Sequence, residues 1–140
     1  MSFRKEKFMS LAGITAVDHP IEELKSISRG LLNDGIHGIC FSAYDEGQQP
    51  GDQLTEAQVR RKLSILKPHI SWVRTFSCTE GNEFIAQIAH EMGIKTLVGA
   101  WLGDDLEKNE AEIAGLIALC KEGVVDVAAV GNEVLYREDL

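Results

Sequence analysis

Glu133 stands where a carboxyl group is best placed for acid–base chemistry. It follows an almost wholly apolar run, residues 124–130, and the pair Gly131–Asn132. A carboxyl group just past a buried strand is partly removed from water, which favours the protonated form that a general acid needs near neutral pH. An equally good interpretation is that Glu133 opens a loop and points into water. The pattern alone does not decide between the two.

Other polar and aromatic residues stand at the ends of further apolar runs. Tyr44 follows the first run, Arg74 lies near the end of the second, and Trp101 lies at the end of the third. The carboxyl ends of parallel strands meet at one edge of a sheet, where α/β proteins place their sites. Aromatic rings stack on the apolar faces of sugars, and amides and hydroxyls form directed hydrogen bonds. The pattern predicts a sugar-binding site of Tyr44, Arg74, Trp101 and Asn132 beside Glu133.

Three of these residues also have a purely structural interpretation. Arg74 is costly inside an apolar run unless it has a partner, so it either forms a buried ion pair or orients a carboxylate in the site. Trp101 is either a stacking platform or internal packing, and its place near a strand end favours the platform. Tyr44 either belongs to the site or fills a loop.

Metal or cofactor chemistry is not indicated by the sequence. None of the four histidines pairs with Cys, Asp or Glu at ligand spacing, and the three cysteines lack CxxC spacing. We expect Cys40, Cys78 and Cys120 to be small core residues, because each lies in or beside an apolar run. The prediction is therefore no metal and no cofactor.

Short apolar runs alternate with helical patterns along the chain. The runs are short and rich in β-branched residues, as is typical of strands buried on both faces of a parallel sheet. Between them, Thr55 and Gln58 form a capping box, Asn82 is a candidate cap, and Gly93 is a candidate left-handed helix end. A further helix is expected over about residues 20–33. The runs predict strands near residues 36–42, 70–76, 94–101 and 124–131.

The last predicted helix has the same start and stop signals. Asn109 and Glu112 repeat the capping pattern, and Gly123 closes the segment. The apolar stripe between them includes Leu116 and Cys120, at helical spacing. We therefore expect this helix to begin after Asn109.

This order of elements fits either an open doubly wound sheet or a barrel. The segment after the first predicted strand, residues 44–50, has no glycine-rich phosphate loop, which disfavours the nucleotide-binding open sheet. A complete (β/α)8 barrel needs about 250 residues. We therefore predict an α/β fold of parallel βα units that form the N-terminal half of a (β/α)8 TIM barrel. Residues 1–34 would be an N-terminal extension with a helix, and residues 35–140 would supply strands 1 to 4 of a barrel truncated at its C-terminus.

Composition excludes some partners. The 140 residues are 44% hydrophobic and 26% charged, which is ordinary for a folded domain, and the formal net charge is −8. An acidic chain is unsuited to nucleic acid or to an anionic membrane surface. The sequence shows no signal peptide and no apolar segment long enough for a membrane span. A cytoplasmic location is the default expectation.

Four motifs in order resemble one known family. They are GICFSAY (residues 38–44) followed by GQQP (47–50), WVRTFS (72–77), GAWL (99–102) and VGNEVLYR (130–137). Together they resemble the first four strands of glycoside hydrolase family 17, in particular its bacterial and fungal β-1,3-glucanase-like branch. The resemblance covers the chain from about residue 35 to its end.

The resemblance implies a (β/α)8 barrel that hydrolyses β-glucans, chiefly at β-1,3 linkages, as a retaining enzyme of the glucan β-1,3-glucosidase type. In that scheme Glu133 is the general acid/base and Asn132 holds the sugar 2-hydroxyl. The family's nucleophile is a second glutamate on the seventh strand, which this sequence lacks. Because retaining hydrolysis needs two carboxyl groups about 5–5.5 Å apart, we expect the 140-residue chain alone to be inactive.

A second function class stays open at this point. A non-catalytic half-barrel could bind glucan oligosaccharides or polysaccharides, or could pair with a second half without hydrolysing anything. An isolated half exposes strand edges, which predicts self-association through those edges.

Overall fold

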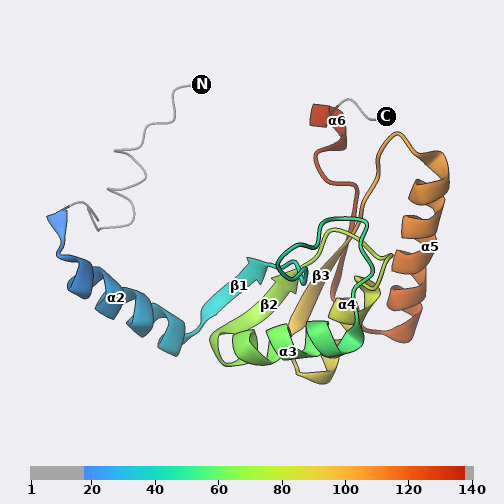
Figure 1. The fold of residues 1–140 in the computed structure, drawn as a ribbon. Coiled ribbons are helices and arrows are strands. Elements are labelled where there is room, and N and C mark those ends of the chain that lie inside the picture. The colour runs from blue at the N-terminus through green and yellow to red at the C-terminus, as the bar shows by residue number, and fades with distance from the viewer. Residues whose placement is uncertain (1–17, 138–140) are drawn as a thin grey trace. The chain divides into compact units, whose positions relative to one another are not determined.

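The computed structural model describes residues 18–137 (Figure 1). The chain divides into two compact units between Asp34 and Gly35. The described part of the first unit contains helix α2 (Ile21–Asp34), which has no buried residue. Backbone bonds from Glu23 and Leu24 to the Pro20 carbonyl form its first turn, close to the predicted start.

The second unit is a parallel sheet with helices between its strands. The strands are β1 (Ile36–Cys40), β2 (Ile70–Arg74), β3 (Lys95–Ala100) and β4 (Val127–Val130), hydrogen-bonded in the order β1-β2-β3-β4. All three neighbouring pairs are parallel. The intervening elements are α3 (Glu56–Leu66), the 3-10 turn η2 (Lys67–His69), α4 (Glu83–Glu91), α5 (Leu106–Glu122) and α6 (Val134–Arg137). The predicted architecture, four adjacent βα units of a half-barrel, is confirmed.

The core lies between the sheet and helices α3, α4 and α5, which line one side of the sheet in Figure 1. Because side chains alternate along a strand, only every second residue of each strand faces these helices. Val73 of β2 and Val98 of β3 are such residues, and each is at most 1% exposed. Burial of a side chain of this size contributes about 1.5–3 kcal/mol. The larger buried side chains include Phe41, Val59, Leu63, Val73, Ile85, Ile88, Val98, Leu116 and Leu119.

The opposite side of the sheet is only partly covered in the described chain. Here the Trp72 ring stacks on His37, with centroids 5.9 Å apart, and the Lys95 ammonium lies 5.4 Å from the Trp72 ring centroid. Val127 of β4, which pairs with Leu97 on this side, is 43% exposed. Gly38 allows close strand contact, because a Cβ there would lie 2.6 Å from the Trp72 Cβ. In a closed barrel this side of the sheet would face the interior.

Helix ends follow the predicted signals in part. The Thr55 side chain accepts from the Gln58 N–H at 3.3 Å, so half of the capping box is present. The Gln58 amide donates instead to the Ala43 carbonyl at 2.7 Å, which ties α3 to the loop after β1. Gly123 ends α5 with φ 79°, as expected.

Helix α5 begins earlier than predicted. Asp105 has extended backbone and its side chain accepts from the Lys108 N–H at 3.1 Å, so Asp105 is the cap. The prediction that Asn109 caps this helix is wrong. The Asn109 amide lies within the first turns and bonds both the N–H and the carbonyl of Gly103 at 2.8 Å.

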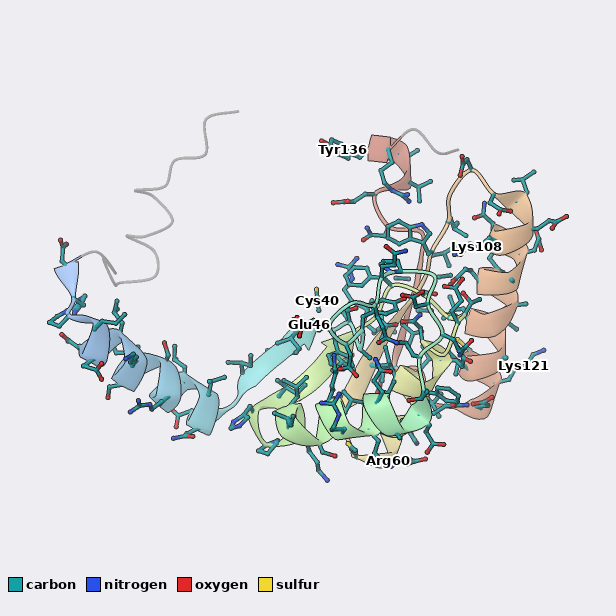
Figure 2. All side chains as sticks on the ribbon, in the orientation of Figure 1. Cys40, Glu46, Arg60, Lys108, Lys121 and Tyr136 are labelled. Atoms are coloured by element: carbon teal, nitrogen blue, oxygen red, sulfur yellow. The ribbon has the colours of Figure 1, made fainter. Side chains whose placement is uncertain are left out.

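The cysteine prediction holds for one residue of three. Cys78 is buried, whereas Cys40 and Cys120 are exposed. Cys40 lies at the end of β1 (Figure 2). Cys120 is exposed because the buried face of α5 continues from Leu116 to Leu119, and not to Cys120 as the predicted stripe did. Among the helices of residues 18–137, none has the length and apolar character needed to cross a membrane.

Candidate functional site

A cavity of about 290 Å³ opens at the carboxyl ends of β1, β2 and β3. Its volume is at the lower end of the usual range for small-molecule sites. Aromatic rings form much of its wall, and polar groups from the β2–α4 turn and from α5 complete it. The lining residues are Phe41, Ser42, Tyr44, Pro50, Gly51, Phe76, Ser77, Glu80, Asn82, Trp101, Lys108 and Glu112.

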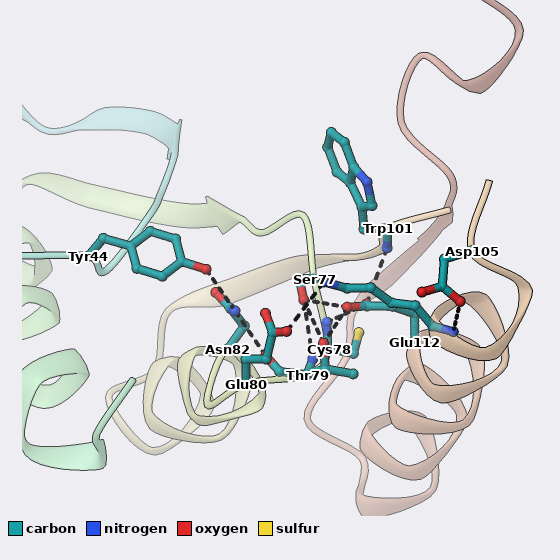
Figure 3. A network of polar contacts seen from close by, with 10 residues as sticks. Tyr44, Ser77, Cys78, Thr79, Glu80, Asn82, Trp101, Asp105 and Glu112 are labelled. Carbon is teal, nitrogen blue, oxygen red and sulfur yellow. Dashed lines mark hydrogen bonds and ion pairs between the residues drawn. The ribbon is translucent and has the colours of Figure 1, made fainter. Parts of the chain in front are cut away.

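Two of the predicted sugar-binding residues, Tyr44 and Trp101, come together in this cavity. Tyr44 arrives from the loop after β1, and its hydroxyl accepts from the Asn82 amide at 3.4 Å (Figure 3). Asn82 was predicted to cap α4. It occupies that position, but its side chain makes no capping bond. It donates to the Thr79 carbonyl at 2.9 Å instead.

One face of the Trp101 ring is in contact with another side chain of the protein. The Arg137 guanidinium lies over the indole, 4.3 Å from the ring centroid. Arg137 also donates to the Leu102 carbonyl at 2.7 Å and to the Asn132 carbonyl at 2.9 Å, so α6 is fastened to the ends of β3 and β4. A ring has two faces, so a flat ligand in the cavity would stack on the face that Arg137 does not cover.

Glu112 was predicted only as part of a helix-capping pattern, but it lines the cavity. Its side chain is 0% exposed and accepts four hydrogen bonds: from the Ser77 hydroxyl at 2.5 Å, the Thr79 hydroxyl at 2.6 Å, the Cys78 N–H at 2.7 Å and the Trp101 N–H at 3.2 Å (Figure 3). A buried carboxylate is costly unless its oxygens are satisfied in this way. Glu112 therefore ties α5 to the segments that follow β2 and β3.

Close approach of α5 permits this arrangement. A Cβ on Gly115 would lie 2.7 Å from the Cys78 carbonyl oxygen, so only glycine fits there without a shift. Burial, and to a smaller extent the Glu112 charge, raise the pKa of the Cys78 thiol to about 12.

The sequence did contain a signal for Glu112. Together with Leu116 and Leu119, Glu112 has the i, i+4, i+7 spacing of a buried helix face.

Arg74 and Asn132 form a contact across the sheet ends. The Arg74 Nη2 donates to Asn132 Oδ1 at 2.8 Å, and the guanidinium lies 4.8 Å from the centroid of the Phe76 ring. The Arg74 Nε is buried and has no hydrogen-bond partner in the described chain. No salt bridge joins Arg74 to a carboxylate within residues 18–137, so its partner there is an amide, and the ion pair, one of the two interpretations of Arg74, is not found.

Glu133 lies at the end of β4 but does not line the cavity. Its side chain is exposed, which agrees with the interpretation that Glu133 points into water and not with the alternative of a partly desolvated carboxyl group. The reason is that β4 itself is poorly covered: Val127 and Val130 are 43% and 65% exposed. Glu133 has φ 55°, a left-handed conformation that is unfavourable for a residue with a Cβ.

Glu80 shares this unusual backbone. Glu80 (φ 58°) and Glu133 are the non-glycine residues with positive φ among those described. Glu80 lines the cavity, and its carboxylate lies 3.3 Å from the Lys108 ammonium. Such strain clusters at functional sites in folded proteins.

Comparison with known proteins supports the family resemblance. No family model and no curated protein sequence matches the chain, but solved structures do. One is the glycoside hydrolase family 17 β-1,3-glucanosyltransferase of Rhizomucor miehei, and another is an active-site mutant of that enzyme in complex with laminaritriose. Each has a TM-score of 0.61 and 25% identity over 77% of this chain. The resemblance to family 17 is confirmed.

The match covers only part of the family 17 structures. This chain spans 40% of the length of each solved chain, which agrees with the four βα units of a half-barrel.

Proposed function

We propose that this chain provides the glucan-binding half of a family 17-type glycoside hydrolase that acts on β-1,3-glucan with retention of configuration. The observation that supports this most directly is the aromatic cavity at the strand carboxyl ends, in a fold similar to that of a protein solved in complex with laminaritriose. Stacking on aromatic rings and hydrogen bonding at the rim are the interactions that a sugar ring needs.

Each predicted residue has a role in the proposal that follows from its contacts. The open face of Trp101 stacks on a sugar ring, and Tyr44 forms part of the opposing wall. Arg74 holds Asn132 Oδ1, so the Nδ2 group of the same amide is left to donate to a sugar 2-hydroxyl. This fixed orientation is why the Arg74–Asn132 contact fits a binding role as well as a structural one.

Glu133 is proposed as the general acid/base of the complete enzyme. It would protonate the departing glycosidic oxygen and then deprotonate the incoming water. Because its side chain is exposed, the water around it would have to be displaced by the bound glucan. Retention needs a second carboxyl group about 5–5.5 Å away, so the proposal assigns binding to this chain and hydrolysis to a protein that also contains the nucleophile.

Calorimetry of the 140-residue chain with laminaritriose tests the binding role. Trp101→Ala should weaken binding by about tenfold or more, because aromatic stacking is lost. Trp72→Ala is the matched control, since Trp72 stacks on His37 and does not line the cavity. Failure of the wild-type chain to bind laminaritriose, or equal weakening by both variants, would reject the proposal.

The acid/base role needs a longer version of the protein that contains the nucleophile. There, Glu133→Gln should slow hydrolysis of unactivated laminarin by orders of magnitude, yet affect an aryl glucoside with a good leaving group much less. Azide, which needs no general base, should partly restore turnover of the activated substrate. Equal slowing of both substrates without azide rescue would contradict the assignment.

A non-catalytic half-barrel that pairs with a second copy is the second candidate. The exposed Val127 and Val130 on β4, the last strand of the described sheet, favour it. Sedimentation analysis with and without laminaritriose separates the candidates: a dimer that binds glucan and releases no reducing ends from laminarin would favour the half-barrel pair. A monomer at high micromolar concentration would argue against it.

A further inference from the structure

Glu80 has no role in the predictions made from the sequence, yet its carboxylate stands in the cavity wall. We infer that Glu80 is a sugar-binding residue, whose carboxylate accepts hydrogen bonds from the hydroxyl groups of a ligand stacked against the aromatic wall. This inference rests on the proposed function, because it names a further residue of the same site.

The backbone at Glu80 argues that the side chain is there for a purpose other than folding. Glu80 and Gly81 both have positive φ, at 58° and 84°, and the Glu80 carbonyl accepts from the Leu54 N–H at 2.9 Å. The left-handed conformation costs a non-glycine residue about 1–2 kcal/mol. Glycine would adopt the same turn without that cost.

The ion pair with Lys108 does not offset this strain. Lys108 projects from α5 (Figure 2), and its ammonium lies 3.3 Å from Glu80 Oε1. The two side chains are 42% and 32% exposed. Exposed pairs of this kind contribute little to stability, because water and salt screen them. The pair does orient the carboxylate, and it leaves Oε2 for a ligand.

Glu80 differs in this respect from the two other glutamates near the cavity. Both oxygens of Glu112 already accept two hydrogen bonds each within the protein. Glu133 lies outside the cavity lining. Glu80 is therefore the cavity carboxylate with acceptor capacity left for a ligand, and it shares the lining with Tyr44 and Trp101. Hydrogen bonds from hydroxyls to a carboxylate are short and strong.

Two variants of the 140-residue chain test this role. Glu80→Gln keeps the size of the side chain and removes its charge, and it should weaken laminaritriose binding by about tenfold. Glu80→Gly removes the side chain and relieves the strained φ, so it should weaken binding further while leaving the urea midpoint unchanged or higher. Glu110→Gln, at an exposed position of α5, is the matched control and should change neither quantity.

The outcomes separate this inference from the proposed function. If the wild-type chain binds laminaritriose and Trp101→Ala weakens binding, but Glu80→Gln binds as the wild type does, only the role of Glu80 is overturned. If Glu80→Gly lowers the urea midpoint markedly, Glu80 is a structural residue and the inference fails. If the wild-type chain does not bind laminaritriose, both the proposed function and the role of Glu80 are rejected.

Discussion

Replacement of Glu112 tests how the cavity wall is held together. The Glu112 carboxylate accepts from two side-chain hydroxyls, Ser77 and Thr79, and from two backbone N–H groups, Cys78 and Trp101. In Glu112→Ala the hydroxyls can rotate toward each other, because their oxygens are 3.3 Å apart. The two N–H groups have no such freedom and lose their acceptor.

The structure gives the size of the effect. An unsatisfied buried donor costs about 1–3 kcal/mol, so two of them lower the free energy of unfolding by about 2–6 kcal/mol in Glu112→Ala. In Glu112→Gln the amide oxygen can accept from both N–H groups while the NH₂ group donates to both hydroxyls. All four contacts then persist without charge assistance, and the loss should be no more than about 2 kcal/mol.

Urea unfolding followed by far-ultraviolet circular dichroism measures these differences, with Glu110→Gln as the control. That variant makes the same chemical change at an exposed position of α5 and should stay within about 0.5 kcal/mol of the wild type. Glu112→Ala with wild-type stability would refute the hydrogen-bond reasoning. Glu112→Gln as unstable as Glu112→Ala would refute the exchange of donors and acceptors.

Three further outcomes follow from the structure. The Cys78 thiol is buried and its pKa is raised to about 12, so a thiol reagent at pH 8 should react with the two exposed cysteines of the native chain and with all three after denaturation. Side-chain hydrogen bonds from Arg61, and to a smaller extent from Lys62, lower the pKa of Asp45 below its usual 3.8. This stabilisation is present above about pH 4 and is lost as the pH falls through the folded-state pKa, so Asp45→Asn should lower the urea midpoint at pH 6 and have a progressively smaller effect as the pH falls below about 4. Gly99→Ala would place a Cβ 2.7 Å from the Thr75 carbonyl oxygen and should destabilise the chain by about 1–3 kcal/mol in the same assay.

The strand order and its parallel pairing were predictable because their signals are local. Short apolar runs indicate buried strands. Glycines such as Gly93 and Gly123 indicate helix ends, because a residue without a Cβ adopts the left-handed conformation found there, with φ of 73° and 79°. The start of α5 was not predictable in this way. Asp105 and Asn109 are both good caps, and only the contact of Asn109 with Gly103 in the folded chain shows which of them caps the helix.

In the candidate site, too, some residues could be placed from the sequence and others only from the folded structure. Sequence places Tyr44 and Trp101 after strands, and parallel pairing then brings them to one edge, where both line the cavity. The spacing of Glu112 with Leu116 and Leu119 marks a buried face, but its donors come from segments after β2 and β3 that meet only on folding. The sequence likewise puts Glu133 just past a strand. How much water surrounds it depends on the neighbours of β4, which tertiary structure alone decides, and here the side chain is exposed.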